Sequence, residues 1–218
     1  MNLLAIETAT ENCSVALAAH DTIYQQSEVA PQRHAQLVLG FVEQVLQQAQ
    51  LSRQDIEGIV FGQGPGAFTG VRIAVSVVQG LALALDVPVL GISTLKALGY
   101  SVCQQQQPAE QSRILVANDA RMGEAYHCAF RWENGGLTEL TAEQVSNPDN
   151  IETSDYDLYV GSAFKTFDAL KHVESVAYAD ALPTAQALLG LALPIFLQQA
   201  VPIEQAQPSY VRNQVVQS

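Results

Sequence analysis

The stretch that decides the fold is LLAIETATENCSVALAAHDTIY, residues 3–24. It contains three segments of strand length: the apolar run 3–6, the alternating run 13–17, and residues 22–24 after a turn at His20-Asp21. Short apolar or alternating runs joined by short polar links are typical of neighbouring strands. The chain is therefore predicted to begin with three strands connected by hairpins.

Helices alternate with further predicted strands after this region. Apolar residues recur at spacings of three and four over residues 33–50, which predicts a helix, and residues 58–62 form a continuous apolar strand. A second helix is predicted over 69–85, a short strand over 88–91, and a third helix with Ser93 as its N-cap. Hairpins followed by βα units predict an α/β fold with a mixed sheet.

The second half of the chain is expected to form a smaller α/β lobe. The polar, low-complexity segment 104–108 favours a boundary between an N-terminal lobe, residues 1–107, and a C-terminal lobe, residues 108–218. The elements predicted in the C-terminal lobe are strands near 114–117, 125–130 and 158–160 and weaker helices at 164–171 and 185–199, the last broken at Pro194.

Composition and charge exclude several classes of protein. The 218 residues are 48% apolar and 15% charged, which excludes a disordered chain, and no run approaches the roughly 20 apolar residues of a membrane span. The 22 acidic and 10 basic residues give a net charge of −12, so both halves are expected to repel nucleic acid. Three separated cysteines and an early apolar run interrupted by Glu7 favour a cytoplasmic protein without a signal peptide.

The most unusual segment is a glycine-rich turn, GQGPGAFTGVR, at residues 62–72. It follows a buried strand and opens a helix, where free backbone N–H groups can bind an anion, but neither GxxxxGK[ST] nor GxGxxG is present. Two interpretations stay open. The segment is either a tight strand-to-helix turn with Thr69 as N-cap, or the docking point of a ligand or second chain to which Arg72 supplies charge.

A carboxylate, Glu7, ends the first predicted strand and is followed by Thr8. Actin-like and hexokinase-like ATPases hold nucleotide phosphates at this place, but with Asp followed by Gly, which lets the turn wrap the phosphate. The longer side chain and the missing glycine disfavour a catalytic phosphate site here.

No catalytic or metal-binding constellation is expected elsewhere. His34 has apolar residues three and four positions later, so a helical His pair is absent, and no serine lies in a GxSxG motif. Residues 119–126 carry two acids and an arginine. We interpret them as a salt-bridged hairpin turn, with a functional loop as the alternative.

The second helix has more apolar surface than one face of a sheet can bury. We therefore predict a protein–protein interface on the first two helices, with coverage of the second helix by the other lobe as the alternative. The predicted interface residues are Val38, Val42, Val45, Val71, Val75, Val78 and Leu81.

These motifs resemble the bacterial TsaB (YeaZ) family over essentially the whole chain. The similar segments are LAIETAT (4–10), CSVAL (13–17), GPGAFTGVRI (64–73), QGLA (79–82), GISTL (91–95), DARMGE (119–124) and PSYVRN (208–213). The sequence departs from the family at Glu7, where many relatives have Asp, and at Ala67, where Ser is common.

The resemblance implies an actin-like (ASKHA, ribonuclease H-like) two-lobed α/β fold with mixed sheets. It also implies a non-catalytic subunit of the complex that makes threonylcarbamoyladenosine beside the tRNA anticodon. In that family a TsaD paralogue carries the metal and the transferase chemistry, and TsaE is an ATPase. The first two helices pair with TsaD or, alone, with a second copy.

Further expectations concern ligands. This chain should need no metal or cofactor, contact no membrane, and leave tRNA mainly to other subunits. A nucleotide at the subunit junction would contact Glu7, Thr8, Thr10, Gly64, Gly66, Thr69 and Arg72. The alternative function is an ATP-dependent phosphotransferase or hydrolase with its phosphate site at residues 7–10.

Overall fold

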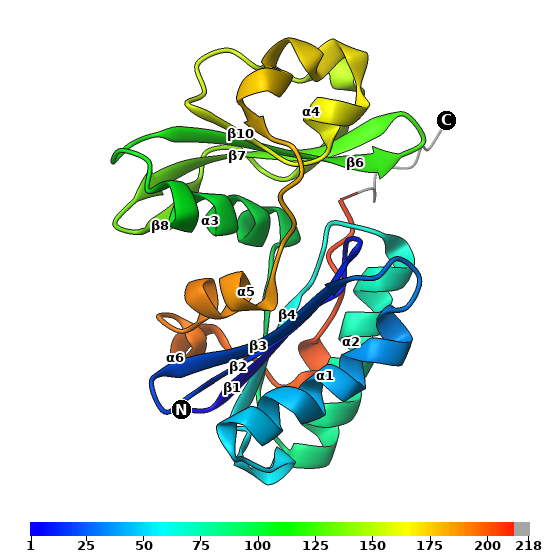
Figure 1. Cartoon of the computed structure of the whole chain (residues 1–218), viewed down its shortest axis with the longest axis vertical. Coiled ribbons are helices and arrows are strands. Elements are labelled where there is room, and N and C mark those ends of the chain that lie inside the picture. Colours follow the sequence, from blue (N-terminus) through cyan, green and yellow to red (C-terminus); the bar gives the residue numbers. More distant parts are fainter. Residues whose placement is uncertain (212–218) are drawn as a thin grey trace. The chain divides into compact units, whose positions relative to one another are not determined.

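The computed structural model describes residues 1–211, apart from the side chains of residues 174–176. The chain forms two compact units (Figure 1). The first unit contains Met1–Ala97 and Pro183–Ser209, and the second contains Leu98–Leu182 with the described residues from Tyr210. The predicted lobes 1–107 and 108–218 therefore differ from the units in the structure, because the chain returns to the first unit at Pro183.

Hydrogen bonds and packing explain this division. The side chain of Asn12 donates to the carbonyl oxygen of Pro183 at 3.0 Å, and the backbone N–H of Ala185 donates to the Ser14 hydroxyl at 3.0 Å. In the third helix, a Cβ on Gly99 would touch the side chain of Val116, which belongs to the second sheet. The third helix therefore joins the second unit over most of its length.

A five-stranded mixed sheet forms the centre of the first unit, in the order β3-β2-β1-β4-β5. Its strands are β1 (Leu3–Glu7), β2 (Asn12–Ala19), β3 (Thr22–Val29), β4 (Gly58–Gly62) and β5 (Val89–Ile92). The first three pair antiparallel, whereas β1, β4 and β5 run parallel. The predicted hairpins and the βα units that follow them are confirmed.

Helices cover both faces of this sheet (Figure 1). On one face lie α1 (His34–Ala49) and α2 (Phe68–Leu85), and on the other lie α5 (Ala185–Ala192) and α6 (Phe196–Gln199). Pro194 lies in the break between α5 and α6, as predicted. Two short 3₁₀ helices, η1 (Arg53–Asp55) and η4 (Ile203–Gln205), complete the unit.

By length and composition alone, α2 could cross a membrane. The core helix of a globular protein passes the same test, and α2 packs on the first sheet through its valines. The chain buries only six of its 18 residues, however, so the helix is not buried on all sides within the chain. Phe68 and Leu83 are 59% and 73% exposed, which leaves apolar surface available.

The second unit has a six-stranded sheet in the order β11-β10-β6-β7-β8, with β9 paired to β7. Its strands are β6 (Arg113–Arg121), β7 (Glu124–Glu133), β8 (Gly136–Glu139), β9 (Gln144–Ser146), β10 (Leu158–Val160) and β11 (Ala177–Tyr178). Its helices are α3 (Thr94–Gln106), α4 (Ala163–Thr166) and the 3₁₀ helices η2 (Pro148–Asn150) and η3 (Asp168–Val176). The three strands predicted here are confirmed. The backbone N–H of Lys96 donates to the Ser93 hydroxyl at 3.0 Å, which confirms the predicted cap of α3.

Candidate functional site

The glycine-rich turn packs against the turn between β1 and β2. A Cβ on Gly70 would collide with the carbonyl oxygen of Thr8, and a Cβ on Gly66 would collide with that of Ala9. The Thr8 hydroxyl donates to the Gly70 carbonyl at 2.8 Å, and the N–H of Ala67 donates to the Ala9 carbonyl at 2.7 Å. The backbone that approaches these glycines closely thus belongs to the chain itself. This agrees with the interpretation of the segment as a tight strand-to-helix turn.

Thr69 does not cap α2, so that prediction is wrong. The helix begins at Phe68, and the extended residue Ala67 occupies the N-cap position without a side-chain hydrogen bond. The Ala67 carbonyl accepts the N–H of Val71 at 2.9 Å, so helical bonding already includes Thr69 in the first turn. The Arg72 guanidinium stacks on the Phe68 ring, 3.6 Å from its centroid.

Glu7 is fully buried at the end of β1. Its Oε1 accepts the N–H of Ala9 at 2.7 Å, and its Oε2 accepts the Thr94 hydroxyl at 3.2 Å. A Cβ on Gly62 would collide with the carboxyl group, so this glycine makes the space that Glu7 fills. Burial raises the pKa of Glu7 to about 7, although the hydrogen bonds from Ala9 and Thr94 act in the opposite direction. Both carboxyl oxygens are engaged by donors of the same unit.

Replacing Glu7 by glutamine is expected to remove a pH dependence of folding stability. The pKa of Glu7 is about 7 in the fold against a usual value of 4.5, so the unfolded chain loses this proton first as the pH rises. The free energy of unfolding of the wild type should therefore fall by on the order of 3 kcal/mol as the pH rises from 4.5 to 7. Above pH 7 this contribution should stay level. Urea unfolding of both proteins at pH 5 and pH 8 measures the difference. Parallel losses in the wild type and Glu7→Gln would contradict the assignment.

The residues predicted to contact a nucleotide differ in their exposure. Glu7, Thr8 and Gly64 are buried, Thr10 and Gly66 are half-buried, and Thr69 and Arg72 are exposed. Two neighbours of the turn were not predicted from the sequence: Thr94 N–H donates to the Gly64 carbonyl at 2.8 Å, and Ser209 N–H donates to the Gln63 carbonyl at 2.7 Å. Thr94 lies in the GISTL segment, but no sequence pattern connects it with Glu7.

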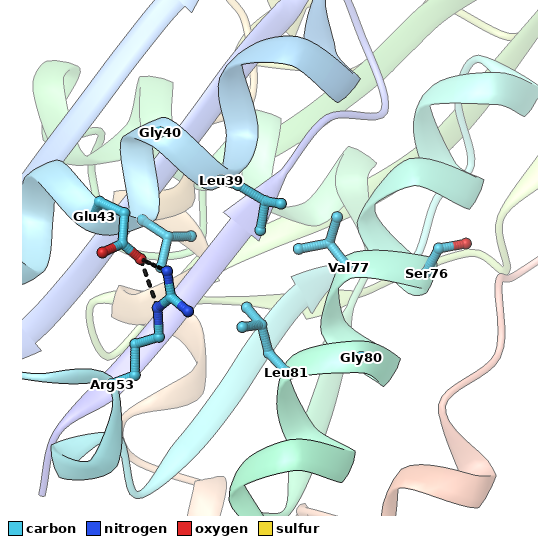
Figure 2. A pocket seen from close by; sticks show the side chains of 9 residues that line it. Leu39, Gly40, Glu43, Arg53, Ser76, Val77, Gly80 and Leu81 are labelled. Carbon is cyan, nitrogen blue, oxygen red and sulfur yellow. Dashed lines mark hydrogen bonds and ion pairs between the residues drawn. The ribbon is translucent and has the colours of Figure 1, made fainter.

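A groove of about 610 Å³ lies between α1 and α2 (Figure 2). Its lining residues come from the two helices and from η1, and we call them the α1–α2 surface: Leu39, Gly40, Val42, Glu43, Arg53, Ser76, Val77, Gly80 and Leu81. Leu39 and Val77 point toward each other from the two helices, as Figure 2 shows. The groove is open toward solvent and has apolar side chains at its centre.

Small residues and a low charge distinguish the α1–α2 surface. A Cβ on Gly40 or on Gly80 would meet nothing within 4 Å, so another chain can approach both helix backbones closely. The charges that line the groove form one ion pair, in which Arg53 Nη2 lies 2.6 Å from Glu43 Oε1. Although the chain has a net charge of −12, this surface has few charged groups that would lose water when another protein covers it.

Six of the seven predicted interface residues lie in the core of the first unit. Val38, Val42 and Val45 of α1 and Val71, Val75 and Val78 of α2 are at most 6% exposed. Leu81 is half-buried and lines the groove, and Val42 also reaches it. The groove lies on the two helices that were predicted, but most of the predicted residues lie on the sides of these helices that face the sheet. Because α2 is apolar around nearly its whole circumference, its sequence does not show which side is buried.

The remaining predictions concern single features. Asp119 and Arg121 form an ion pair at 3.1 Å in the β6–β7 turn, which confirms the salt-bridged hairpin. The three cysteines are buried and free, as expected: Cys13, Cys103 and Cys128. Among the side chains that the structure describes, no three of His, Cys, Asp or Glu are placed to hold a metal ion. Arg212 and Asn213 of the family-like tail lie outside the described residues.

Comparison with known proteins gives consistent matches. The family model described as TsaD, tRNA N6-adenosine threonylcarbamoyltransferase, matches residues 19–203. The tRNA threonylcarbamoyladenosine biosynthesis protein TsaB of Escherichia coli K12 is 36% identical, over 99% of this chain and 96% of that protein. Its counterpart from Haemophilus influenzae is 31% identical, over 99% and 95%.

Solved structures agree with these matches. YeaZ from Pseudomonas aeruginosa is 36% identical and superposes with a TM-score of 0.88, over 96% of this chain and 99% of that chain. A second structure, described as an uncharacterized protein from Pseudomonas aeruginosa with similarity to peptidase YEAZ, gives a TM-score of 0.89 over 97% and 99%, at 36% identity. These matches support the actin-like α/β fold with mixed sheets that the sequence motifs implied. The chain belongs to the TsaB (YeaZ) family of tRNA threonylcarbamoyladenosine biosynthesis proteins.

Proposed function

We propose that this chain is a non-catalytic scaffold and activator subunit of the complex that transfers threonylcarbamoyl to a tRNA adenosine beside the anticodon. It pairs with a TsaD-type catalytic subunit through the α1–α2 surface. The observation that carries the proposal is an apolar groove with Gly40 and Gly80 open to another chain. The relatives are named as tRNA threonylcarbamoyladenosine biosynthesis proteins, and these names supply the reaction.

The match to the TsaD family model supports the choice of partner. A TsaD-type subunit shares the fold of residues 19–203, so it has helices that correspond to α1 and α2. Two similar surfaces can pair about an approximate two-fold axis, in the way that identical subunits form symmetric dimers. The same geometry allows this chain to pair with a second copy when the partner is absent.

The role of this chain is proposed to be non-catalytic because the polar groups at the end of β1 are engaged within the fold. The Ala9 N–H and the Thr94 hydroxyl both donate to Glu7, and the Thr8 hydroxyl donates to Gly70. The TsaD-type subunit then carries the metal and the transfer step, and a TsaE-type ATPase hydrolyses the nucleotide.

The proposal also covers tRNA, cofactors and location. Because the net charge of this chain is −12, the other subunits bind most of the tRNA. The complex works in the cytoplasm. The chain requires no cofactor of its own. A nucleotide at the subunit junction would contact Thr69 and Arg72, since these are the exposed members of the predicted set.

The experiment that tests the pairing is size-exclusion chromatography with light scattering. The chain is mixed with the purified TsaD-type subunit of the same organism, and a complex with the mass of one copy of each is expected. Threonylcarbamoylation of tRNA by the TsaD-type and TsaE-type subunits should then depend on this chain. Absence of a complex at micromolar concentration would overturn the proposal. ATP hydrolysis by the chain alone that is lost in Glu7→Ala would instead favour the phosphotransferase or hydrolase alternative.

A further inference from the structure

The outer edge of β3 is the longest unpaired strand edge among the strands that the structure describes. β3 has eight residues and ends the first sheet, with β2 as its one neighbouring strand. The other edge of this sheet, β5, is shorter, and its Val89 exchanges backbone hydrogen bonds of 2.9 and 2.8 Å with Val201. In the second sheet, the edge strands β8, β9 and β11 have four residues or fewer. Short or covered edges resist pairing with other chains, and β3 lacks this protection.

Other features that prevent strand pairing are also missing from β3. Its pairing with β2 runs from Thr22 to Val29 without a bulge, and its sequence, TIYQQSEV, contains neither proline nor lysine. The one charged side chain, Glu28, forms an ion pair with Arg33 at 2.9 Å. Six of the eight residues are exposed and the other two are half-buried, so another chain can reach the edge along its whole length.

The turn between β2 and β3 determines which backbone groups point outward. His20 and Asp21 have φ of 52° and 57°, which is a type I′ turn, and such a two-residue turn is closed by a hydrogen-bonded pair, here Ala19 and Thr22. Hydrogen-bonded and non-hydrogen-bonded pairs alternate along antiparallel strands. The even-numbered residues of β3 therefore bond to β2, and the odd-numbered residues direct their N–H and C=O groups to the open edge. These outward-facing residues are Ile23, Gln25, Ser27 and Val29.

This row of outward-facing groups is complementary to itself. A two-fold axis through Gln26, perpendicular to the sheet, places Ile23 opposite Val29 of a second copy, and Gln25 opposite Ser27. Every outward-facing residue then exchanges hydrogen bonds with an outward-facing residue of the other copy. A shift by two residues would leave an outward-facing residue at one end without such a partner. Ile23 and Val29 are 37% and 62% exposed, so their contact on one face of the joined sheet buries apolar surface.

The charges of the strand allow this register. Glu28 lies opposite Tyr24 of the second copy, so the two glutamates do not face each other, and each is already paired with Arg33. The net charge of −12 opposes the approach of two copies, so salt should strengthen the pairing. Two strand edges bury far less area than the roughly 1,600 Å² of a stable interface, so we expect weak pairing, with a Kd on the order of 100 μM.

We propose that the outer edge of β3 binds a second copy of this chain, so that the two β3 strands pair antiparallel about Gln26 and join two five-stranded sheets into one. A second copy supplies outward-facing groups at the same spacing, with matching side chains opposite them, which an arbitrary extended segment does not. β3 contributes no residue to the α1–α2 surface, so the proposal is independent of the proposed function.

Disulfide trapping tests the register. Gln26→Cys places two thiols opposite each other in a non-hydrogen-bonded pair, whose Cα atoms lie about 4.5 Å apart. Thr22→Cys is the matched control in the same strand, because its two copies would lie about 26 Å apart. Both are made in the Gly80→Arg protein, which has a charged side chain on the α1–α2 surface, and are oxidised with diamide. The native cysteines are buried. A covalent dimer from Gln26→Cys and none from Thr22→Cys is expected, whereas equal yields or no dimer from Gln26→Cys would overturn the proposal.

Sedimentation equilibrium tests the pairing without a covalent bond. The Gly80→Arg protein should show a monomer–dimer equilibrium that salt strengthens. Adding Gln25→Pro should raise its Kd at least about tenfold with little change in melting temperature, because the N–H that proline removes points away from β2. Gln26→Lys, which sets two ammonium groups opposite each other, should have the same effect. A Gly80→Arg protein that stays monomeric up to about 1 mM, ten times the expected Kd, or a dimer that neither variant weakens, refutes the proposal.

Amide hydrogen exchange distinguishes a second copy from another protein on this edge. The N–H groups of residues 23, 25, 27 and 29 should become protected as the concentration of the Gly80→Arg protein rises, whereas those of the even-numbered residues are protected by β2 throughout. Protection of the odd-numbered residues that depends on concentration supports a second copy. Protection that appears only when a TsaD-type subunit is added to the wild type would assign the edge to that subunit and refute the proposal.

Discussion

Replacing Gly80 by arginine is expected to abolish the pairing of this chain with a TsaD-type subunit while leaving its fold intact. Gly80 is exposed, and a Cβ added there meets nothing within 4 Å, so the helix can accept a side chain at this position. Loss of a glycine from an exposed helix position stabilises the helix by about 1 kcal/mol. In the complex, the same side chain would occupy the centre of the α1–α2 surface. Kd should rise by at least about 100-fold, as at an interface hot spot. Isothermal titration calorimetry and thermal melting measure the two effects.

Gln48→Arg is the matched control for this prediction. Gln48 is an exposed residue of α1 that does not line the groove, and the substitution adds the same charge. It should leave Kd within about twofold of the wild type, because charges outside an interface contribute little at ordinary salt. Equal loss of affinity in both variants would point to a charge effect. Wild-type affinity in Gly80→Arg would show that the partner binds elsewhere.

Replacing Gly70 by alanine is expected to destabilise the first unit strongly. A Cβ at this position collides with the backbone carbonyl of Thr8, which cannot move away without shifting the β1–β2 turn. Overpacking against backbone should cost about 3 kcal/mol, measured by urea unfolding.

Gly80→Ala is the control for this second prediction, because it makes the same change in the same helix. With nothing near its Cβ, it should stabilise the protein by about 1 kcal/mol. If Gly70→Ala is as stable as the wild type, the glycine-rich turn does not depend on close contact with Thr8. The two variants together separate the conformational preference of alanine from the collision.

The order of strands and helices along the first half of the chain was predictable because its signals are local. Residues 3–24 contain three short runs separated by turns, and the turn at His20-Asp21 lies where the structure has a two-residue hairpin. The first two helices begin and end within one residue of the predicted positions. Periodicity and turn chemistry determine such elements, and both can be read along the chain.

The orientation of α2 was not predictable from its sequence. Apolar side chains cover nearly its whole circumference, so the pattern does not indicate which side faces the sheet. In the structure Val71, Val75 and Val78 take the inner side, and Gly80 and Leu81 line the groove. The three valines of α2 that were predicted for the interface are therefore buried in the structure, and the interface itself stays a prediction.

Contacts between distant segments set the other limits. The glycines at 64, 66 and 70 indicate that something approaches the backbone, but not that Thr8, Ala9 and Ser209 do so. The division into units was missed for the same reason, since no composition shift marks the return of the chain at Pro183.

That return has a consequence for how the protein forms during synthesis. The hydrogen bond from Ala185 to Ser14 joins residues 171 positions apart, so one face of the first sheet stays uncovered until α5 has left the ribosome. Contacts of such long sequence separation slow folding and leave apolar surface exposed meanwhile. The first unit combines the beginning of the chain with residues 183–209. A chain whose synthesis stops before α5 would therefore expose one face of the first sheet to aggregation and proteolysis.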